Sequence, residues 1–237
     1  MTAISSRAGP SPAHLAATRA AWHRVAEHVL AAARYAATGH IGLVPAPGGF
    51  RTPPFGADRR FLAVDGAELV ASDVAGTRRT PLTTIRAAAA FAGITPGAPA
   101  QVYTPATPLD LDRPLTIDPG AARLLSDWYS LGARVMSRFA AEIPDEEPSP
   151  AVLWPEHFDL GITAGPVNYG ASPGDTHCAD PYLYVSPHDG PPRGEPAFWN
   201  APFGAARTFR QISTVAEAAA FFRDARARAI TPTRRTS

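Results

Sequence analysis

The feature that most constrains the fold is a long apolar stripe that begins after Asp118 and Pro119. A capping residue followed by proline at the first helical position is typical of a helix start. Apolar residues then recur every three or four positions, which predicts a helix over 119–141 with one face in the core. That face comprises Leu124, Trp128, Leu131, Val135 and Phe139, and it is widened by Leu125, Tyr129 and Met136.

Two further helices are predicted near the ends of the chain. Ser11 and Pro12 start a helix over about 12–37, and Gly39 supplies a left-handed stop. A capping box of Thr214 and Glu217 starts the other, over 214–228. In the first helix the histidines lie beside the apolar stripe and are expected at the surface or at a cap. These are His14, His23 and His28.

Between these helices the sequence predicts antiparallel strands. Asp65-Gly66 separates two short apolar runs, 60–64 and 67–71, and suits the tight turn of a hairpin. A third strand is expected over 77–82, followed by a short helix that Thr83 or Thr84 caps and Gly93 ends. Residues 95–117 are rich in proline, and a segment of that length is either functional or contains strands that the pattern does not reveal.

These patterns together predict a single α+β domain over residues 11–230. The sheet is expected to be mainly antiparallel, with three to four helices packed against it. Residues 1–10 are predicted to be a disordered leader and residues 231–237 a disordered tail.

Composition excludes several classes of function. A net charge of +1 argues against a nucleic-acid-binding domain, which is usually strongly basic. The longest apolar run is far too short to span a bilayer. The only cysteine, Cys178, cannot form an internal disulfide, which favours a reducing compartment, and the expected location is therefore cytoplasmic. No lysine occurs, and all 22 basic residues are arginine, which is typical of a GC-rich genome.

Chemistry-bearing residues concentrate between Leu153 and Asn200. If 151–162 forms one strand, Trp154, Phe158, Leu160 and Ile162 share the core face. His157 and Asp159 then point to the opposite face, as Tyr182 and Tyr184 do on a second strand. If the two strands pair as a hairpin, these side chains and the loop between the strands converge on one rim.

A metal site is one interpretation of that rim. Two imidazoles and two carboxylates suit zinc, manganese or iron. They belong to His157, Asp159, Asp175 and His177, and Glu156 is the candidate catalytic base if the strand bends enough to bring it round. The spacing matches no established metal motif. A second interpretation makes Cys178 a nucleophile with His157 or His177 as its base.

A third interpretation is a binding face for a small polar ligand, without catalysis. Phenol and indole rings offer flat surfaces with polar tips, and amides fix polar groups. The candidate residues are Asn168, Tyr169, Tyr182, Tyr184, Trp199 and Asn200, joined by Asp175. The structural alternative is that Ser172 to Asp175 form a tight turn, Asp159 and Asp175 cap backbone amides, and the tyrosines are half-buried sheet residues.

The motif run WPEHFDLGI, NYGASPGD, PYLYV and FWNAPFGA resembles a family of unassigned activity from bacteria with GC-rich genomes. The earlier segments RYAATGHIGL and APGGFRTP are similar to that family as well. The resemblance covers most of the chain and implies a single unit from about 12 to 230. It implies no cofactor, substrate or site residue.

The sequence therefore leaves three classes of function open. The leading expectation is a cytoplasmic protein that binds a small polar ligand on the face formed by residues 157–184. The alternatives are a metal-dependent hydrolase or lyase with a His/Asp site, and a partner-binding or structural protein without catalysis. Neither a membrane nor a nucleic acid is expected as a partner, and the oligomeric state stays open.

Overall fold

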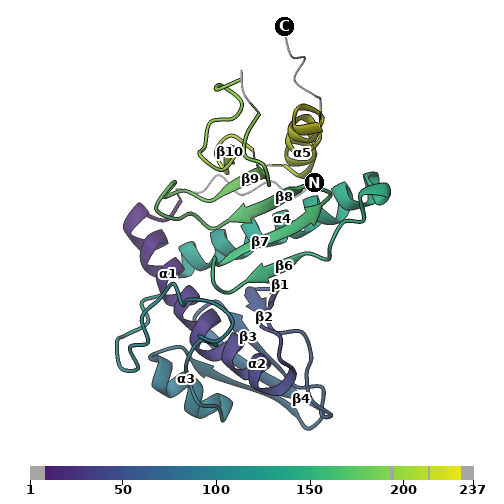
Figure 1. Ribbon diagram of the computed structural model, residues 1–237. Coiled ribbons are helices and arrows are strands. Elements are labelled where there is room, and N and C mark those ends of the chain that lie inside the picture. The colour runs from purple at the N-terminus through teal and green to yellow at the C-terminus, as the bar shows by residue number, and fades with distance from the viewer. Residues whose placement is uncertain (1–8, 193–194, 213, 231–237) are drawn as a thin grey trace, which may run out of the picture. The chain divides into compact units, whose positions relative to one another are not determined.

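The computed structural model describes residues 9–192, 195–212 and 214–230 (Figure 1). It contains two antiparallel sheets of five strands each, together with helices, so the predicted α+β class with mainly antiparallel sheet is confirmed. The predicted tail, and the predicted leader up to residue 8, lie outside the described residues. No described helix combines the length and the apolar character that crossing a membrane requires.

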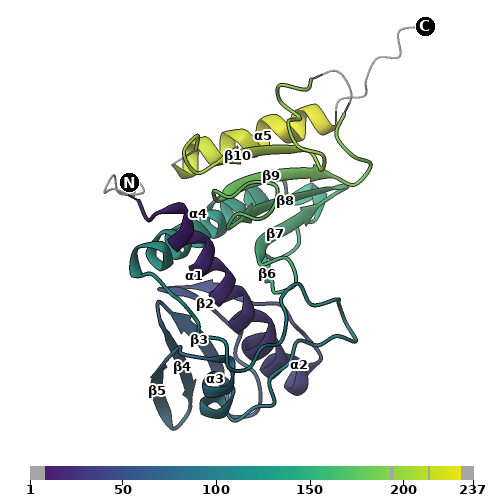
Figure 2. The ribbon, with the colours of Figure 1, turned by 90° about the vertical axis from the view of Figure 1, so that its left-hand side faces the viewer.

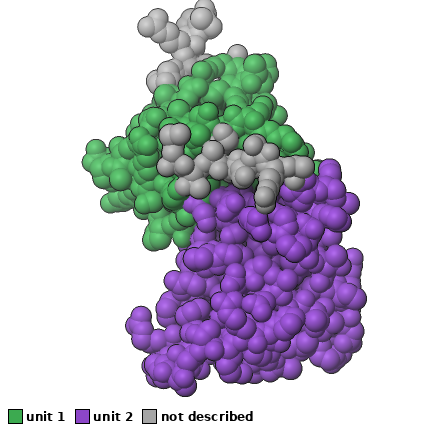
Figure 3. Space-filling view, turned by 180° about the vertical axis from the view of Figure 1, so that it is seen from behind, with its two compact units in different colours: residues 1–5, 131–151, 160–237 green, residues 6–130, 152–159 purple. Residues whose placement is uncertain are grey.

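The chain forms two compact units, which Figure 3 colours separately. Unit 2 comprises residues 6–130 and 152–159, of which residues 9–130 and 152–159 are described. In unit 1 the structure describes residues 131–151, 160–192, 195–212 and 214–230.

Unit 2 begins with one continuous helix in three parts. They are α1 (Pro12–Val25), a π-helical stretch η1 (Ala26–Ala31) and α2 (Ala32–Thr38). The Ser11 hydroxyl accepts a hydrogen bond from the His14 amide at 3.2 Å, and Gly39 ends the helix in the left-handed region, with φ 73°. Both predicted ends are confirmed, but the π-helical stretch has no signal in the apolar periodicity.

The sheet of unit 2 is a meander in the order β1-β2-β3-β4-β5. Its strands are β1 (Val44–Ala46), β2 (Gly49–Arg51), β3 (Phe61–Asp65), β4 (Glu68–Asp73) and β5 (Gly76–Pro81). Asp65 pairs with Glu68, so the predicted hairpin is confirmed with its turn one position later, at Gly66 and Ala67. The helix α1-η1-α2 lies across one face of this sheet (Figures 1 and 2).

After β5 the chain forms α3 (Ile85–Ala92), which Thr84 caps and Gly93 ends, as predicted. Residues 93–118 then run without helix or strand to α4 (Pro119–Glu142). The Asp118 carboxylate caps this helix by accepting a hydrogen bond from the Ala121 amide at 2.8 Å, which confirms the predicted start. The first part of α4 belongs to unit 2 and the part from Leu131 onward to unit 1.

Aromatic rings form the centre of the unit 2 core. Trp22 meets Phe50 edge to face, with ring centroids 5.6 Å apart, and Phe50 meets Phe158 in the same way at 5.3 Å. Tyr129 packs on Phe158 and donates its hydroxyl to the Phe158 carbonyl at 2.7 Å. The Trp22 indole N–H donates to the Gly66 carbonyl at 3.0 Å, which ties helix α1 to the hairpin turn.

The sheet of unit 1 runs in the order β10-β9-β8-β7, with every pair antiparallel. The strands are β7 (Asp159–Ala164), of which unit 1 holds the part from Leu160, β8 (Val167–Ser172), β9 (Tyr182–Pro187) and β10 (Ala205–Thr208). One face carries the apolar residues Leu160, Ile162, Tyr169, Ala171, Leu183 and Val185.

Helices α4 and α5 (Val215–Ile230) pack on that apolar face. Phe139 of α4 and Phe222 of α5 both contact the Tyr169 ring, with centroids 4.7 and 5.3 Å away. The predicted capping box is confirmed, because Thr214 and Glu217 each bond the other's backbone amide, at 3.0 and 3.2 Å. Close approach of α4 depends on Gly132, since a Cβ there would lie 2.8 Å from the Ala171 side chain.

The predicted single strand over 151–162 is wrong. Strand β6 (Val152–Trp154) ends at a turn over residues 155–158, and β7 begins only at Asp159. The turn breaks the alternation, so Trp154, expected in the core, is 40% exposed. The predicted pairing of this region with Tyr182–Val185 is wrong as well, because β8, taken as a loop, lies between β7 and β9.

The packing of the unit 1 sheet can be tested by substitution at Gly170, because the Tyr184 ring lies across this residue. A Cβ at position 170 would come within 2.1 Å of a Tyr184 ring carbon, whereas one at the cross-strand partner Gly161 would make only ordinary contacts, from 3.5 Å. We expect Gly170→Ala to lower the free energy of unfolding by about 1–3 kcal/mol, the range for overpacking. Urea denaturation should show Gly161→Ala within about 0.5 kcal/mol of the parent. Equal effects of the two changes would contradict this packing.

Candidate functional site

The four predicted metal ligands are divided between the two units. His157 and Asp159 belong to unit 2, and Asp175 and His177 belong to unit 1. Across the described part of the chain, no three His, Cys, Asp or Glu side chains are grouped in a way that could hold a metal ion. The structure therefore gives no support to the predicted four-ligand set.

Asp175 has a structural role that requires no ligand. One carboxylate oxygen accepts from the His177 and Cys178 amides at 2.8 and 3.0 Å, and the other accepts from the Tyr182 hydroxyl at 2.5 Å. The alternative that Asp175 caps backbone amides is confirmed. His177 is exposed, and its ring lies edge to face on Phe203 with centroids 5.1 Å apart.

The predicted ligand-binding residues lie in unit 1, and they too make contacts of their own. Tyr169 is fully buried in the core, Tyr182 is buried, and Tyr184 covers Gly170. Asn168 accepts from the Thr163 hydroxyl at 2.7 Å, and Asn200 bonds both backbone groups of Ala206. Trp199 is buried against Phe198. These contacts give no support to a ligand-binding role, which stays a prediction for all six residues.

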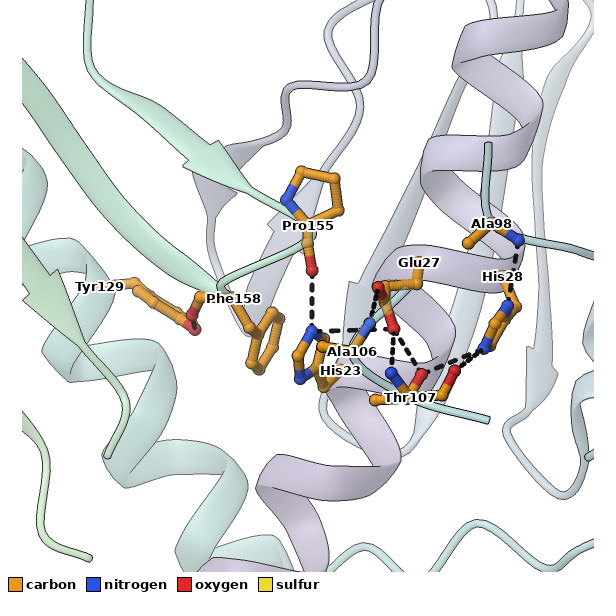
Figure 4. A network of polar contacts seen from close by, with 9 residues as sticks. All are labelled: His23, Glu27, His28, Ala98, Ala106, Thr107, Tyr129, Pro155 and Phe158. Atoms are coloured by element: carbon orange, nitrogen blue, oxygen red, sulfur yellow. Dashed lines mark hydrogen bonds and ion pairs between the residues drawn. The ribbon is translucent and has the colours of Figure 1, made fainter. Parts of the chain in front are cut away.

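A different group of polar side chains comes together inside unit 2, and we name it the polar centre. Figure 4 draws His23, Glu27, His28 and Thr107 of this group with their contacts. Three of its residues lie in or beside the π-helical stretch, two on the irregular segment 93–118, and one on the turn after β6. They are His23, Glu27, His28, Tyr103, Thr107 and Glu156. Only Glu156 was predicted as a site residue.

Glu27 is the most deeply buried charged residue of the polar centre, with no exposed surface. Its two carboxylate oxygens accept from the Ala106 and Thr107 amides at 2.9 and 2.8 Å, and from the Thr107 hydroxyl at 2.5 Å. Three donors compensate much of the cost of burying a carboxylate. Glu27 therefore fastens the irregular segment to the helix.

His28 fastens the same segment at two points. Its Nδ1 accepts from the Ala98 amide at 3.1 Å, so this nitrogen carries no proton, and Nε2 donates to the Thr107 carbonyl at 3.1 Å. Burial lowers the pKa of His28. The imidazole is thus held neutral, because a proton on Nδ1 would break the bond to Ala98.

His23 has the same tautomer but a different environment. Its Nε2 lies 2.8 Å from the Pro155 carbonyl, which can only accept, and 3.9 Å from a Glu27 carboxylate oxygen. The ring stacks on Phe158 with centroids 5.0 Å apart and planes 9° from parallel. Burial lowers its pKa, although the Glu27 carboxylate acts in the opposite direction. Nδ1 makes no hydrogen bond to any described residue, and Figure 4 shows it directed away from Glu27.

Tyr103 and Glu156 each bury a polar atom that is unpaired within the described chain. These atoms are the Tyr103 hydroxyl and Oε2 of Glu156. Burial raises the pKa of the Tyr103 phenol, and the Glu27 and Glu156 carboxylates raise it further. Burial also raises the pKa of Glu156, where Asp159 and Glu27 add to the effect and His157 opposes it. The Tyr103 phenol therefore keeps its proton, and the Glu156 carboxyl takes up a proton more readily than an exposed carboxyl does.

The turn that carries Glu156 has an unusual backbone. The Phe158 amide donates to the Trp154 carbonyl at 2.7 Å, and Phe158 itself adopts φ 54°, a left-handed conformation that bulky residues rarely take. Such a residue costs about 1–3 kcal/mol and persists only where its surroundings fix it. Here the buried Phe158 ring is held by Phe50, Tyr129 and His23. The turn is therefore rigidly placed beside His23.

Sequence reasoning missed His23 and His28, which were expected at the surface or at a cap but are largely buried. The usable signal was the i, i+4 spacing of His23 and Glu27, which places an imidazole and a carboxylate on one face of a helix. Their burial could not be foreseen, because it depends on segment 93–118, which has no periodicity of its own.

Comparisons of the chain with protein-family models, curated proteins and solved structures found no match. The resemblance of the motif run to a bacterial family therefore stays a prediction, and the polar centre is interpreted from its own contacts.

The Glu27 contacts predict a large cost when the carboxylate is removed. Glu27→Ala leaves two backbone amides and a hydroxyl without their acceptor, so we expect a loss of about 3 kcal/mol in urea denaturation. Hydrogen exchange at Ala106 and Thr107 should accelerate most. The exposed Glu68, paired with Arg79 at 3.0 Å, is the control, and Glu68→Ala should cost at most about 1 kcal/mol. A Glu27→Ala effect as small as that would refute the fastening role.

The buried histidines predict acid sensitivity. Because the pKa of His28 is lower in the folded than in the unfolded state, the unfolded chain binds more protons at mildly acidic pH. Stability should fall as pH drops below about 6.5, the ordinary pKa of histidine, and down through the folded pKa. Unfolding free energies at pH 7.5 and 5.5 should differ less in His28→Gln than in the parent protein. An equal difference in His28→Gln and in the parent protein would contradict this role of His28.

Proposed function

We propose that the chain binds a small polar ligand at the polar centre of unit 2. The observation that carries the proposal is the pair of buried, unpaired polar atoms, the Tyr103 hydroxyl and Oε2 of Glu156. Leaving one such group unpaired costs about 1–3 kcal/mol, and native proteins contain few of them. A ligand with hydrogen-bonding groups would satisfy both.

The charges around these atoms indicate what kind of ligand is suitable. The Tyr103 hydroxyl can donate a hydrogen bond, and Oε2 of Glu156 can accept one or, when protonated, donate one; burial raises the pKa of both groups. The His23 Nδ1, which makes no hydrogen bond to a described residue, supplies a further acceptor. A compound that carries a hydroxyl beside a carbonyl or ether oxygen presents the complementary groups. The alternative of a metal-dependent enzyme gains no support, because no three His, Cys, Asp or Glu side chains among the described residues are grouped in a way that could hold a metal ion.

The proposal retains the predicted class, a protein that binds a small polar ligand, but bases it on different residues. Of the residues named from the sequence, Glu156 takes part, now as a ligand contact. A cytoplasmic location is proposed with it, supported by the single cysteine, Cys178.

The test uses two matched substitutions. Tyr103 and Tyr169 both bury a hydroxyl without a described partner, one in the polar centre and one in the unit 1 core. Removing either hydroxyl relieves an unpaired group, so Tyr103→Phe and Tyr169→Phe should fold and keep the parental stability to within about 1 kcal/mol. Thermal unfolding is then measured with glycerol, glucose, lactate, ethanolamine and adenosine as probes, and native mass spectrometry is used to look for a co-purified molecule.

We expect a hydroxylated probe or a co-purified compound to stabilise the parent and Tyr169→Phe but not Tyr103→Phe. A ligand present at about 100 times its Kd should raise the free energy of unfolding by about 2.7 kcal/mol. If neither the probes nor mass spectrometry reveals a ligand, or if Tyr103→Phe retains binding, the polar centre is a structural element only.

A further inference from the structure

The two histidines of the polar centre have the same tautomer, but they differ in whether Nδ1 is hydrogen-bonded. In both, Nε2 carries the proton and donates to a backbone carbonyl, that of Pro155 for His23 and that of Thr107 for His28. The Nδ1 of His28 is engaged by the Ala98 amide. The Nδ1 of His23 is not engaged by any described residue, so its lone pair is available to another molecule.

The groups near Nε2 of His23 are arranged to stabilise a positive charge on the imidazole ring. If Nδ1 gains a proton, the imidazolium still donates from Nε2 to the Pro155 carbonyl at 2.8 Å. The Glu27 carboxylate lies 3.9 Å from the same nitrogen, and its position is fixed by its bonds to Ala106 and Thr107. A carboxylate near an imidazole stabilises its protonated form, as the third member of a catalytic triad does, while here the Pro155 carbonyl accepts the hydrogen bond that orients the ring.

The ring itself is fixed in orientation. Phe158 stacks flat against it, and the carbonyl of Pro155 accepts a hydrogen bond from its Nε2 at 2.8 Å. The π-helical stretch starts three residues after His23, and such stretches occur frequently at functional sites. His23 keeps only 16% of its side-chain surface exposed, so it is confined and still open to solvent at one edge.

We propose that His23 is a general base whose Nδ1 takes a proton from the bound ligand or from a water molecule beside it, and that Glu27 is its positioning residue. In this step an O–H bond of the ligand or water breaks, an N–H bond forms at Nδ1, and the positive charge lies between the Pro155 carbonyl and Glu27. The proton returns to the product or to solvent. The inference rests on the proposed ligand site and adds that this site is catalytic.

The electrostatics agree with this role. Burial lowers the pKa of His23, and the charged forms of His28 and His157 lower it further, whereas Glu27 and the Pro155 carbonyl raise it. On balance the free base is favoured at neutral pH, as a general base requires. The titratable side chains that act on His23 are thus Glu27, His28 and His157.

The test needs no knowledge of the ligand. Long-range proton–nitrogen NMR of the intact protein identifies the tautomer of each histidine, with His23→Gln for assignment. We expect His23 to be protonated at Nε2 and unprotonated at Nδ1 at pH 7, with a titration midpoint below about 6.5, the ordinary pKa of histidine. A proton on Nδ1, or a midpoint at or above that ordinary value, would overturn the proposal.

Reaction with diethyl pyrocarbonate, followed by peptide mass spectrometry, reports whether Nδ1 is accessible. An ordinary imidazole loses about fourfold in rate between pH 8 and pH 6, because only its neutral form reacts. We expect His23 to lose less than this, because its pKa is lowered. A native protein in which His23 does not react would refute the proposal, since Nδ1 would then be closed to any ligand.

The Glu27→Gln variant distinguishes an electrostatic effect of Glu27 on His23 from a role of Glu27 in packing alone. If this variant folds, as circular dichroism would show, the titration midpoint of His23 should fall further, because the carboxylate that raises it is gone. An unchanged midpoint would contradict the role of Glu27, and if the variant does not fold, the measurements on the parent protein decide the proposal. These measurements do not depend on ligand binding. If the site binds its ligand but His23 gives the opposing results, the site binds that ligand without general-base catalysis.

Discussion

The buried Glu27 carboxylate is the interaction on which the organisation of unit 2 depends. It accepts three hydrogen bonds from segment 93–118 and lies within 4 Å of His23. An ionised group without solvent is tolerated only when its surroundings supply donors, and here the donors come from a segment with no helix or strand. One carboxylate therefore both orders the longest irregular part of the chain and sets the environment of an imidazole. Structural and chemical roles are not separable at this residue.

Much of the fold follows from local signals. The caps at Ser11, Thr84, Asp118 and Thr214 were readable from the sequence, and so, to within one position, was the hairpin turn at Gly66 and Ala67, because each acts within a few residues. The alternation of Leu183 and Val185 with Tyr182 and Tyr184 was correct as well, since those residues lie within one regular strand. Signals of this kind need no knowledge of distant neighbours.

The site was far less predictable, because it depends on two departures from regular geometry. The turn at 155–158 interrupts what the apolar pattern presents as one strand, and it is held by Phe158 in a left-handed conformation that only tertiary contacts sustain. The π-helical stretch alters the phase of the first helix just where Glu27 and His28 lie. Neither feature has a compositional signature, so the residues near 157–184 attracted attention while those near 23–28 did not.

The π-helical stretch also has a consequence for how this helix can vary. A regular α-helix turns by about 100° per residue, so one extra residue in an uninterrupted helix would rotate everything beyond it by about that amount. A π-helical turn instead takes up the extra residue locally, and the helix on either side keeps its face toward the core. Here Trp22 before the stretch and Ala33 after it are both buried. The stretch is thus a place where the helix can hold one residue more than a regular turn while its flanking faces stay in register.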